Sequence, residues 1–154
     1  TKHQLAAKPG EQPGGWSPLR TLKRGLSRFA KACLQPDPQI LWYPNAVAAG
    51  SRALRQTPHD AILCTAPPYT SFLVGRALKQ RFGLPLVLDY RDEWDLSSEY
   101  LEHAHRDRWS RWVQERQQQA VLRAADAVVA TTQASVDRLG SRLDALGHAA
   151  LRQC

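Results

Sequence analysis

Short apolar runs alternate with longer amphipathic segments along the last two thirds of the chain. Residues 61–65, 84–90 and 127–131 are apolar runs bounded by turn-forming residues, which predicts three buried β-strands. The runs do not alternate with polar residues, a pattern typical of parallel strands covered by helices on both faces. From residue 61 onward the predicted order is strand, helix, strand, helix, strand, helix. This order indicates an α/β fold with a Rossmann-like parallel sheet and flanking helices.

Apolar residues at helical spacing predict helices before, between and after these strands. Helices are expected over residues 45–56, 70–82 and 99–124, and from the N-cap Thr132 to about residue 146. Gly83 is expected to end the second of these helices as its C-cap. The longest helix would turn Trp112 and Val121 inward, and Trp109 is likewise expected to pack rather than to form an exposed stacking platform.

The N-terminal third differs in composition and charge. Residues 1–17 are rich in Gly, Pro, Lys and Gln and are expected to form a loop or a disordered segment. Residues 18–35 predict a helix in which apolar and basic positions interleave, namely Leu19, Leu22, Leu26, Phe29 and Ala30 with Arg20, Lys23, Arg24, Arg28 and Lys31. Residues 1–60 hold nine Lys and Arg residues against three acidic ones. Such a helix could contact nucleic acid, anionic lipid or a phosphorylated acceptor, or could simply present a solvated face.

Length and composition allow one domain. The 154 residues suffice to bury a core, and 43% hydrophobic with 23% charged residues excludes the disordered and fibrous classes. No apolar run approaches the roughly 18 residues of a membrane span, and no signal-peptide pattern is present. The sequence starts at Thr1 and lacks Met, and three strands are half of the about six in a Rossmann-like domain. We therefore expect residues 18–154 to be the later half of such a domain, cut from a longer protein.

Cysteine and histidine positions favour neither a disulfide nor a metal site. Cys33, Cys64 and Cys154 are far apart and form no CxxC pair, which fits a reducing cytoplasm. His103 and His105 lie two positions apart on a predicted helix, so their side chains diverge. We expect no metal ion and no bound cofactor.

Ligands of open parallel sheets bind beyond the carboxyl ends of the strands, which selects three loops here. They are residues 65–71, 91–95 and 131–132. In the first loop, the N–H groups that open a helix, with the hydroxyls of Thr70 and Ser71, could hold an anion or sugar hydroxyls. The same hydroxyls could instead simply cap the helix. Neither a Walker loop nor a GxGxxG pattern is present.

The second loop is the richest in charge. Five charged residues and one indole follow a predicted buried strand within a short stretch: Asp89, Arg91, Asp92, Glu93, Trp94 and Asp95. One interpretation is that Asp89 and Asp92 pair with Arg91 and fix the loop. The other is that Arg91 and Asp92 face the crevice and contact a hydroxyl-rich or phosphorylated ligand.

An ordered set of short motifs extends from residue 36 to residue 126. It consists of Pro36-Asp37, Leu41-Trp42, Asp60-x-Ile62, Thr65-Ala66-Pro67-Pro68, the block Leu84-Pro85-x-Val87-x-Asp89-x-Arg91-Asp92-x-Trp94, and Ala125-Asp126. With this set the chain, over about residues 36–140, resembles the N-terminal domain of family 4 glycosyltransferases. The resemblance implies the GT-B architecture, in which two Rossmann-like domains face each other across a cleft. It also implies that this chain is the acceptor-side domain, and that a C-terminal domain outside this sequence binds the nucleotide sugar.

The resemblance further implies an activity and site residues. The parent protein would transfer a sugar, in a hexosyltransferase-like reaction without a metal ion, from a nucleotide-sugar co-substrate to a polysaccharide, lipid-linked or other glycoconjugate acceptor. Asp92 and Arg91 are the best candidates for catalytic residues. Many relatives carry His-Asp where this chain has Arg91-Asp92, and an arginine cannot act as a general base, so Arg91 would act electrostatically or by positioning. The predicted substrate-binding residues are Thr65, Pro67, Pro68, Tyr69, Thr70, Ser71, Arg91, Asp92 and Trp94.

The implied setting is the cytoplasmic face of a membrane, where lipid-linked acceptors reside, and this chain alone is expected to be inactive. A peripheral contact with anionic lipid would use the basic residues Arg20, Lys23, Arg24, Arg28 and Lys31. The alternative is a non-enzymatic basic α/β module that binds nucleic acid or an anionic surface, which the sequence pI of 9.8 supports. Binding of nucleic acid is the less favoured of these because no nucleic-acid-binding motif is present.

Overall fold

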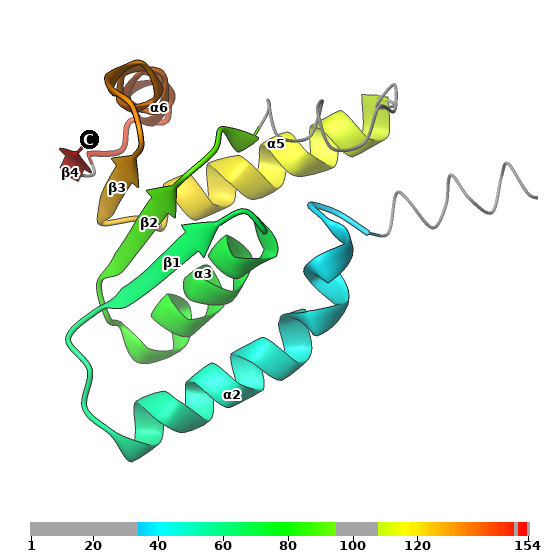
Figure 1. Ribbon diagram of the computed structural model, residues 1–154, viewed down its shortest axis with the longest axis vertical. Helices are drawn as coiled ribbons and strands as arrows, with labels where there is room; N and C mark the ends of the chain where they lie inside the picture. Colours follow the sequence, from blue (N-terminus) through cyan, green and yellow to red (C-terminus); the bar gives the residue numbers. More distant parts are fainter. Residues whose placement is uncertain (1–33, 95–107, 150, 154) are drawn as a thin grey trace, which may run out of the picture.

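The computed structural model describes residues 34–94, 108–149 and 151–153, which form a parallel sheet with helices packed against it (Figure 1). The elements follow in the order η1 (Pro38–Trp42), α2 (Tyr43–Gln56), β1 (Ile62–Ala66), α3 (Thr70–Phe82), β2 (Leu86–Tyr90), α5 (Arg108–Leu122), β3 (Ala127–Ala130), α6 (Gln133–Ala145) and β4 (Leu151–Gln153). The α/β class expected from the sequence is confirmed. The predicted basic helix and the boundary after residue 17 lie outside the described residues, apart from positions 34 and 35.

The sheet has four parallel strands in the order β1-β2-β3-β4. Its register pairs Ile62 with Leu86, Val87 with Ala127, and Ala127 with Leu151. The three predicted strands are therefore present, and the expectation of three strands was one too few. The sequence pattern missed β4 because this strand spans only three residues and two of them are polar, so no apolar run marks it.

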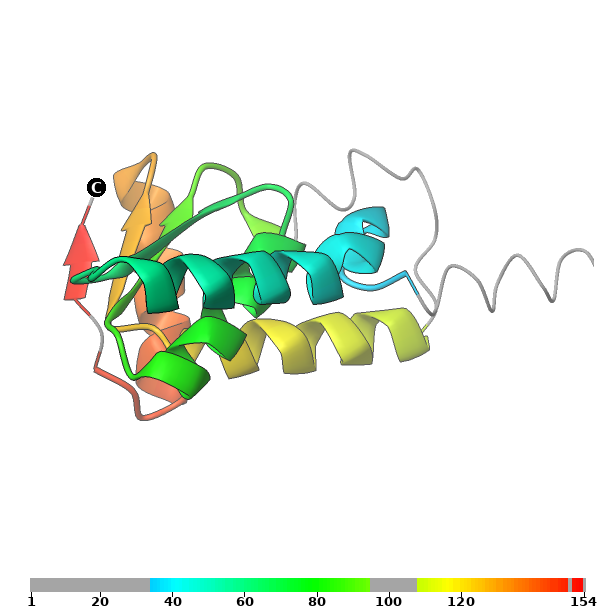
Figure 2. The ribbon, with the colours of Figure 1, turned by 90° about the horizontal axis from the view of Figure 1, so that it is seen from below.

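One face of this sheet carries the core, and the other is bare among the described residues. Since paired residues of parallel strands point to the same face, Ile62, Leu86 and Val128 share the buried face, over which α3, α5 and α6 lie (Figure 2). The strand order follows the chain order, so successive right-handed crossovers leave the sheet on the same side. On the opposite face Leu63 is 67% exposed. The prediction that helices cover both faces is wrong for the described residues.

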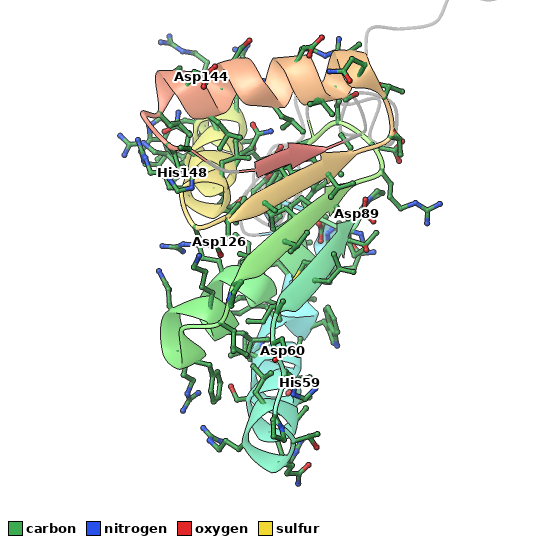
Figure 3. All side chains as sticks on the ribbon, turned by 90° about the vertical axis from the view of Figure 1, so that its left-hand side faces the viewer. His59, Asp60, Asp89, Asp126, Asp144 and His148 are labelled. Atoms are coloured by element: carbon green, nitrogen blue, oxygen red, sulfur yellow. The ribbon has the colours of Figure 1, made fainter. Side chains whose placement is uncertain are left out.

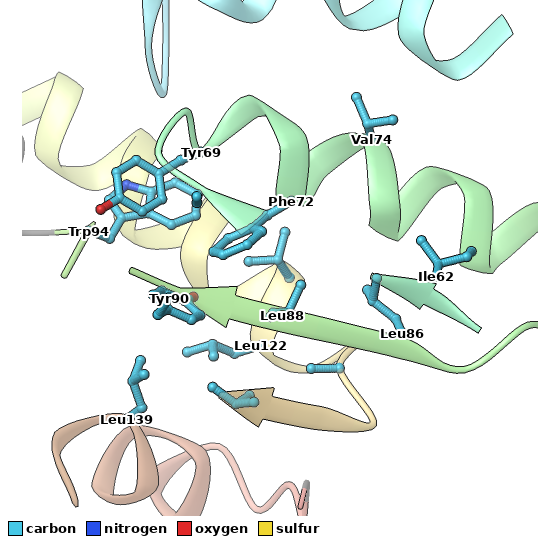
Figure 4. Close-up of a cluster of buried hydrophobic side chains, with 14 of the residues drawn as sticks. Ile62, Tyr69, Phe72, Val74, Leu86, Leu88, Tyr90, Trp94, Leu122 and Leu139 are labelled. Atoms are coloured by element: carbon cyan, nitrogen blue, oxygen red, sulfur yellow. The ribbon is translucent and has the colours of Figure 1, made fainter. Parts of the chain in front are cut away.

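The core is one continuous cluster in which aromatic rings close the carboxyl end of the sheet. Phe72 packs against Tyr90 with ring centroids 4.6 Å apart, and both rings are almost fully buried (Figure 4). Further along, Leu86, Leu122 and Leu143 fill the space between the sheet and the helices. Fully burying a side chain of this size contributes about 1.5–3 kcal/mol, so this cluster supplies the main driving force for folding.

The predicted C-cap of α3 and the predicted N-cap of α6 are both confirmed. Gly83 follows α3 with φ of 74°, the left-handed conformation that glycine adopts without strain. Thr132 caps α6 by accepting a hydrogen bond from the Ser135 amide at 3.2 Å. Both features act within a few residues along the chain, which explains why the sequence alone predicted them.

Helix α5 is turned differently from the prediction. Val121 is fully buried as expected, but Trp112 is 48% exposed and Trp109 is 58% exposed. Three of the five buried positions on this helix are taken by polar residues, namely Ser110, Gln114 and Gln118. The predicted inward placement of Trp112 and the packing role of Trp109 are therefore wrong, for reasons that involve residues distant in sequence.

Candidate functional site

Three loops meet at the carboxyl ends of the strands, as the topology requires. The Arg91 amide donates to the Ala66 carbonyl oxygen at 3.1 Å, which joins the loop after β2 to the end of β1. The Thr131 hydroxyl donates to the Arg91 carbonyl oxygen at 3.2 Å, which joins the same loop to the end of β3. The loop that begins at Arg91 is therefore held between its two neighbours. Asp95, the last residue of the predicted site loop, lies outside the described residues.

The N-terminus of α3 already holds a carboxylate. Asp37 accepts hydrogen bonds from the Thr70 amide at 2.9 Å and from the Thr70 hydroxyl at 2.6 Å. The Ser71 hydroxyl donates to the carbonyl oxygens of Thr65 and Pro68. Thr70 is fully buried, and both hydroxyls donate within the protein, so they brace the start of the helix, while the Asp37 carboxylate caps it by accepting from the Thr70 amide. Asp37 was part of the motif set, but nothing in the local sequence indicated that it reaches α3.

Two buried aromatic rings support the loop that follows β2. Tyr69 and Trp94 stack with ring centroids 4.5 Å apart, and both are at least 95% buried (Figure 4). The Tyr69 hydroxyl also donates to the Asp92 carbonyl oxygen at 3.0 Å. The sequence predicted these aromatic residues as ligand contacts, and the structure places their rings beneath the surface of the loop.

Glu93 anchors the same loop to α6. Its Oε1 accepts a hydrogen bond from the Ser135 hydroxyl at 2.9 Å and forms an ion pair with Arg138. Neither α6 residue was predicted to belong to the site. Ser135 and Arg138 lie more than forty positions after Glu93 in the chain, so only the tertiary structure reveals these contacts.

The side chains of Arg91 and Asp92 remain exposed at this edge, beside the exposed Thr65, Pro67 and Thr131. Within the described residues no ion pair joins Arg91 to Asp89 or Asp92. Asp89 is half-buried and pairs in register with Thr65 and Val129, which places it on the bare face of the sheet. The loop is therefore fixed by the Tyr69–Trp94 stack and by Glu93, and not by the Arg91 pairing that one interpretation proposed.

The opposite end of the sheet is structural. Figure 3 shows Asp126 and His148 far from Asp89, at the amino ends of the strands. Asp126 accepts a hydrogen bond from the Leu86 amide at 2.6 Å and forms an ion pair with Lys79. Burial tends to raise the pKa of Asp126, but the hydrogen bonds from Lys79 and Leu86 together with nearby positive charge lower it overall. Asp126 thus fixes the start of β2.

A groove lies between α2 and the outer edge of β1. It encloses about 780 Å³ and is mostly apolar, with Trp42, Ala49, Leu63 and Val74 among its lining residues. Thr65 and Ser71 of the loop after β1 are also among its lining residues, so the groove adjoins that loop. No local sequence pattern predicts this groove, because it forms between two elements that are brought together only by the tertiary structure.

Neither a metal-ligand cluster nor a membrane-spanning helix is found among the described residues. Among the described residues no group of His, Cys, Asp and Glu is arranged to hold a metal ion. The described helices include none that is long and apolar enough to cross a bilayer.

Comparison with protein-family models identifies the domain. Residues 4–147 match the family described as glycosyl transferase 4-like domain. The chain belongs to this family. Comparisons with curated proteins and with solved structures gave no match. The glycosyl transferase 4-like match covers the resemblance noted between residues 36 and 140, and it extends toward the N-terminus. The match indicates that the protein from which this chain comes is a transferase, and it agrees with a Rossmann-like parallel sheet.

Proposed function

We propose that this glycosyl transferase 4-like chain forms the acceptor side of the cleft in a GT-B enzyme that transfers a sugar from a nucleotide sugar to an acceptor. The observation that carries the proposal is the exposed Arg91-Asp92 pair at the carboxyl ends of the strands. Neither side chain is engaged in an ion pair within the described residues, while the backbone beneath them is fixed on both sides. Exposed charged side chains on a well-fixed backbone are typical of a ligand-binding site.

The two side chains suit different parts of a glycan acceptor. The Asp92 carboxylate can accept a hydrogen bond from an acceptor hydroxyl and orient its oxygen toward the anomeric carbon of the donor. The Arg91 guanidinium, a permanent cation with five donors, can bind a phosphate or several hydroxyl oxygens of the same acceptor. Thr65 and Pro67 would form the exposed wall of this site, and Pro68 and Ser71 its base. Tyr69, Thr70 and Trp94 would act by holding the loops in place.

The remaining parts of the reaction follow from the same proposal. The nucleotide sugar would be a co-substrate held by a second domain, with no metal ion taking part. The acceptor would be a polysaccharide, a lipid-linked sugar or another glycoconjugate with a free hydroxyl, and transfer would be hexosyltransferase-like. The chain by itself would bind acceptor without turnover.

Binding measurements on this chain test the proposal directly. Isothermal titration with a panel of free and lipid-linked oligosaccharides and of nucleotide sugars should find an acceptor-type glycan that binds. Arg91→Ala and Asp92→Asn should each weaken that binding about tenfold or more, the size expected for a lost charge-assisted contact. The melting temperature should be unchanged, because both side chains are exposed.

Arg123→Ala is the matched control. Arg123 is an exposed arginine that follows α5 and precedes β3, at the amino end of the sheet, so its removal should leave glycan binding intact. Equal losses in Arg91→Ala and Arg123→Ala would contradict a specific site. Binding of nucleotide sugars without any glycan would contradict the acceptor-side assignment.

A further inference from the structure

Helix α5 exposes both of its tryptophans and buries three uncharged polar residues. Trp109 and Trp112 are 58% and 48% exposed, whereas Ser110, Gln114 and Gln118 are at most 6% exposed. The two tryptophans depart from the usual amphipathic pattern, in which the apolar stripe of a helix faces the core, as Val121 and Leu122 of α5 do. A pair of exposed indoles on one helix face is more informative than scattered exposed leucines, because burying indoles is strongly favourable.

Hydrogen bonds and core packing hold α5 in this orientation. The Gln114 amide donates to the Gln35 side chain and to the Pro36 carbonyl oxygen, at 3.2 Å for the latter. Arg142 of α6 donates to the Gln118 oxygen at 2.5 Å, and Val121 is fully buried. Turning the tryptophans inward would break these contacts and leave buried polar groups unpaired, which costs about 1–3 kcal/mol for each group. The indoles therefore stay outside.

The exposed face of α5 combines indole and guanidinium groups. Trp109 and Trp112 stack on each other with centroids 5.0 Å apart, and the Arg116 guanidinium lies over the Trp112 ring, 5.3 Å from its centroid. Arg108 and Arg111 are also exposed, and none of the three arginines forms an ion pair within the described residues. The Glu115 side chain, the acidic group on this face, accepts a hydrogen bond from Gln119. The face, which we term the α5 tryptophan face, is thus apolar at its centre and positively charged around it.

We propose that the α5 tryptophan face, formed by Arg108, Trp109, Arg111, Trp112 and Arg116, docks on the surface of a bilayer that contains anionic lipid. Indole rings favour the boundary between head groups and acyl chains, and arginines are attracted by anionic head groups. A small sugar ligand would need a concave site, whereas this face is the convex side of a helix. The membrane contact expected from the sequence used residues 20–31, a different segment that lies outside the described residues.

The position of this face deepens the proposed function, on which this part of the inference rests. The N-terminal half of α5 extends past the carboxyl ends of the strands, toward the side where the Arg91 loop lies (Figures 1 and 2). A protein docked through the tryptophans would therefore hold its acceptor site close to the head groups. Lipid-linked sugars present their hydroxyls at that depth.

Vesicle co-flotation tests the proposal with the full 154-residue chain. The chain should float with phosphatidylcholine vesicles that contain phosphatidylglycerol, and it should bind pure phosphatidylcholine vesicles much more weakly. The double variant Trp109→Ala/Trp112→Ala should bind anionic vesicles about tenfold or more weakly, because the buried apolar area is lost. Replacing Arg108 and Arg111 with Gln should weaken binding about fivefold for each arginine and should reduce the salt dependence.

Trp42→Ala is the matched control, because it removes an indole of similar exposure, 52%, from η1. It should bind vesicles as the wild type does. Unchanged binding in the α5 double variant, equal loss in Trp42→Ala, or equal binding to neutral vesicles would each overturn the proposal. Dimers of the wild type that dissociate in the double variant, seen by size-exclusion chromatography without vesicle binding, would overturn it in favour of a protein interface.

Two readouts separate this proposal from the proposed function. Arg91→Ala should lose glycan binding and still float with anionic vesicles. Brominated lipids should quench the tryptophan emission of the wild type more than that of Trp109→Phe/Trp112→Phe. If acrylamide cannot reach these two indoles in the vesicle-free protein, another part of the chain covers them, and the proposal is wrong.

Discussion

The carboxylate of Asp37 binds both the backbone amide and the hydroxyl of Thr70, at 2.9 and 2.6 Å, across 33 positions of the chain. The Asp37 carboxylate lies at the N-terminus of α3, where the helix dipole favours a negative group. The contact therefore ties the segment before η1 to the loop that carries the candidate site. It also occupies the helix N-terminus at which the sequence suggested an anion or a sugar.

Removal of this contact should destabilise the protein measurably. Asp37→Ala leaves the Thr70 amide and hydroxyl without their acceptor in a buried position, so we expect the free energy of unfolding to fall by about 1–3 kcal/mol. Urea denaturation measures the change. Asp60→Ala, which removes an exposed carboxylate, should stay within about 0.5 kcal/mol of the wild type. Similar losses in both variants would show that Asp37 has no special role.

The Tyr69 hydroxyl should matter for ligand binding although the Tyr69 side chain is buried. Tyr69→Phe keeps the ring stack on Trp94 but removes the hydrogen bond to the Asp92 carbonyl oxygen. We expect a loss of about 0.5–1.5 kcal/mol in stability. Glycan affinity should also fall, because the backbone of the Arg91-Asp92 pair becomes less fixed.

Urea denaturation and titration with the glycan found above measure these two effects. Tyr43→Phe is a suitable control because Tyr43 belongs to α2 and its hydroxyl forms no hydrogen bond with another described residue. Unaltered glycan affinity in Tyr69→Phe would mean that the hydroxyl does not position the loop.

The stabilising effect of Asp126 should depend on pH in a defined direction. Its pKa is lowered in the folded protein, so its contribution is present above the unfolded pKa of about 3.9 and disappears as the pH falls through the lower folded value. Asp126→Asn should therefore be less stable than the wild type near neutral pH, and the difference should shrink below about pH 4. Urea denaturation at several pH values measures it. A difference that stays constant, or grows, toward acid pH would show that the carboxylate charge is not what stabilises the start of β2.

The features that the sequence predicted correctly are local. The strands β1, β2 and β3 are apolar runs, α3 ends at Gly83, and α6 begins after Thr132, each recognisable from residues within one or two turns of the element. The loops at the carboxyl ends of the strands followed from topology, since parallel strands end at the same edge. Arg91 and Asp92 could be singled out in this way from charge and position alone.

The features that escaped prediction depend on residues far apart in the chain. The inward face of α5 is set by Gln35, Pro36 and Arg142, whose hydrogen bonds to the glutamines outweigh the apolar pattern of the helix. The capping of Thr70 by Asp37 is likewise invisible to any short window.

The sequence by itself determined the α/β class, most of the element bounds and the motif set of a glycosyl transferase 4-like domain. Only the tertiary structure decided which site residues are exposed, which are buried supports, and which face of α5 meets solvent. The physical reason is that secondary structure and turns respond to neighbours along the chain, whereas burial and hydrogen-bond partners depend on which elements pack together. Trp109, Trp112 and Trp94 illustrate the division, since all three were equally conspicuous in the sequence and only one of them is buried.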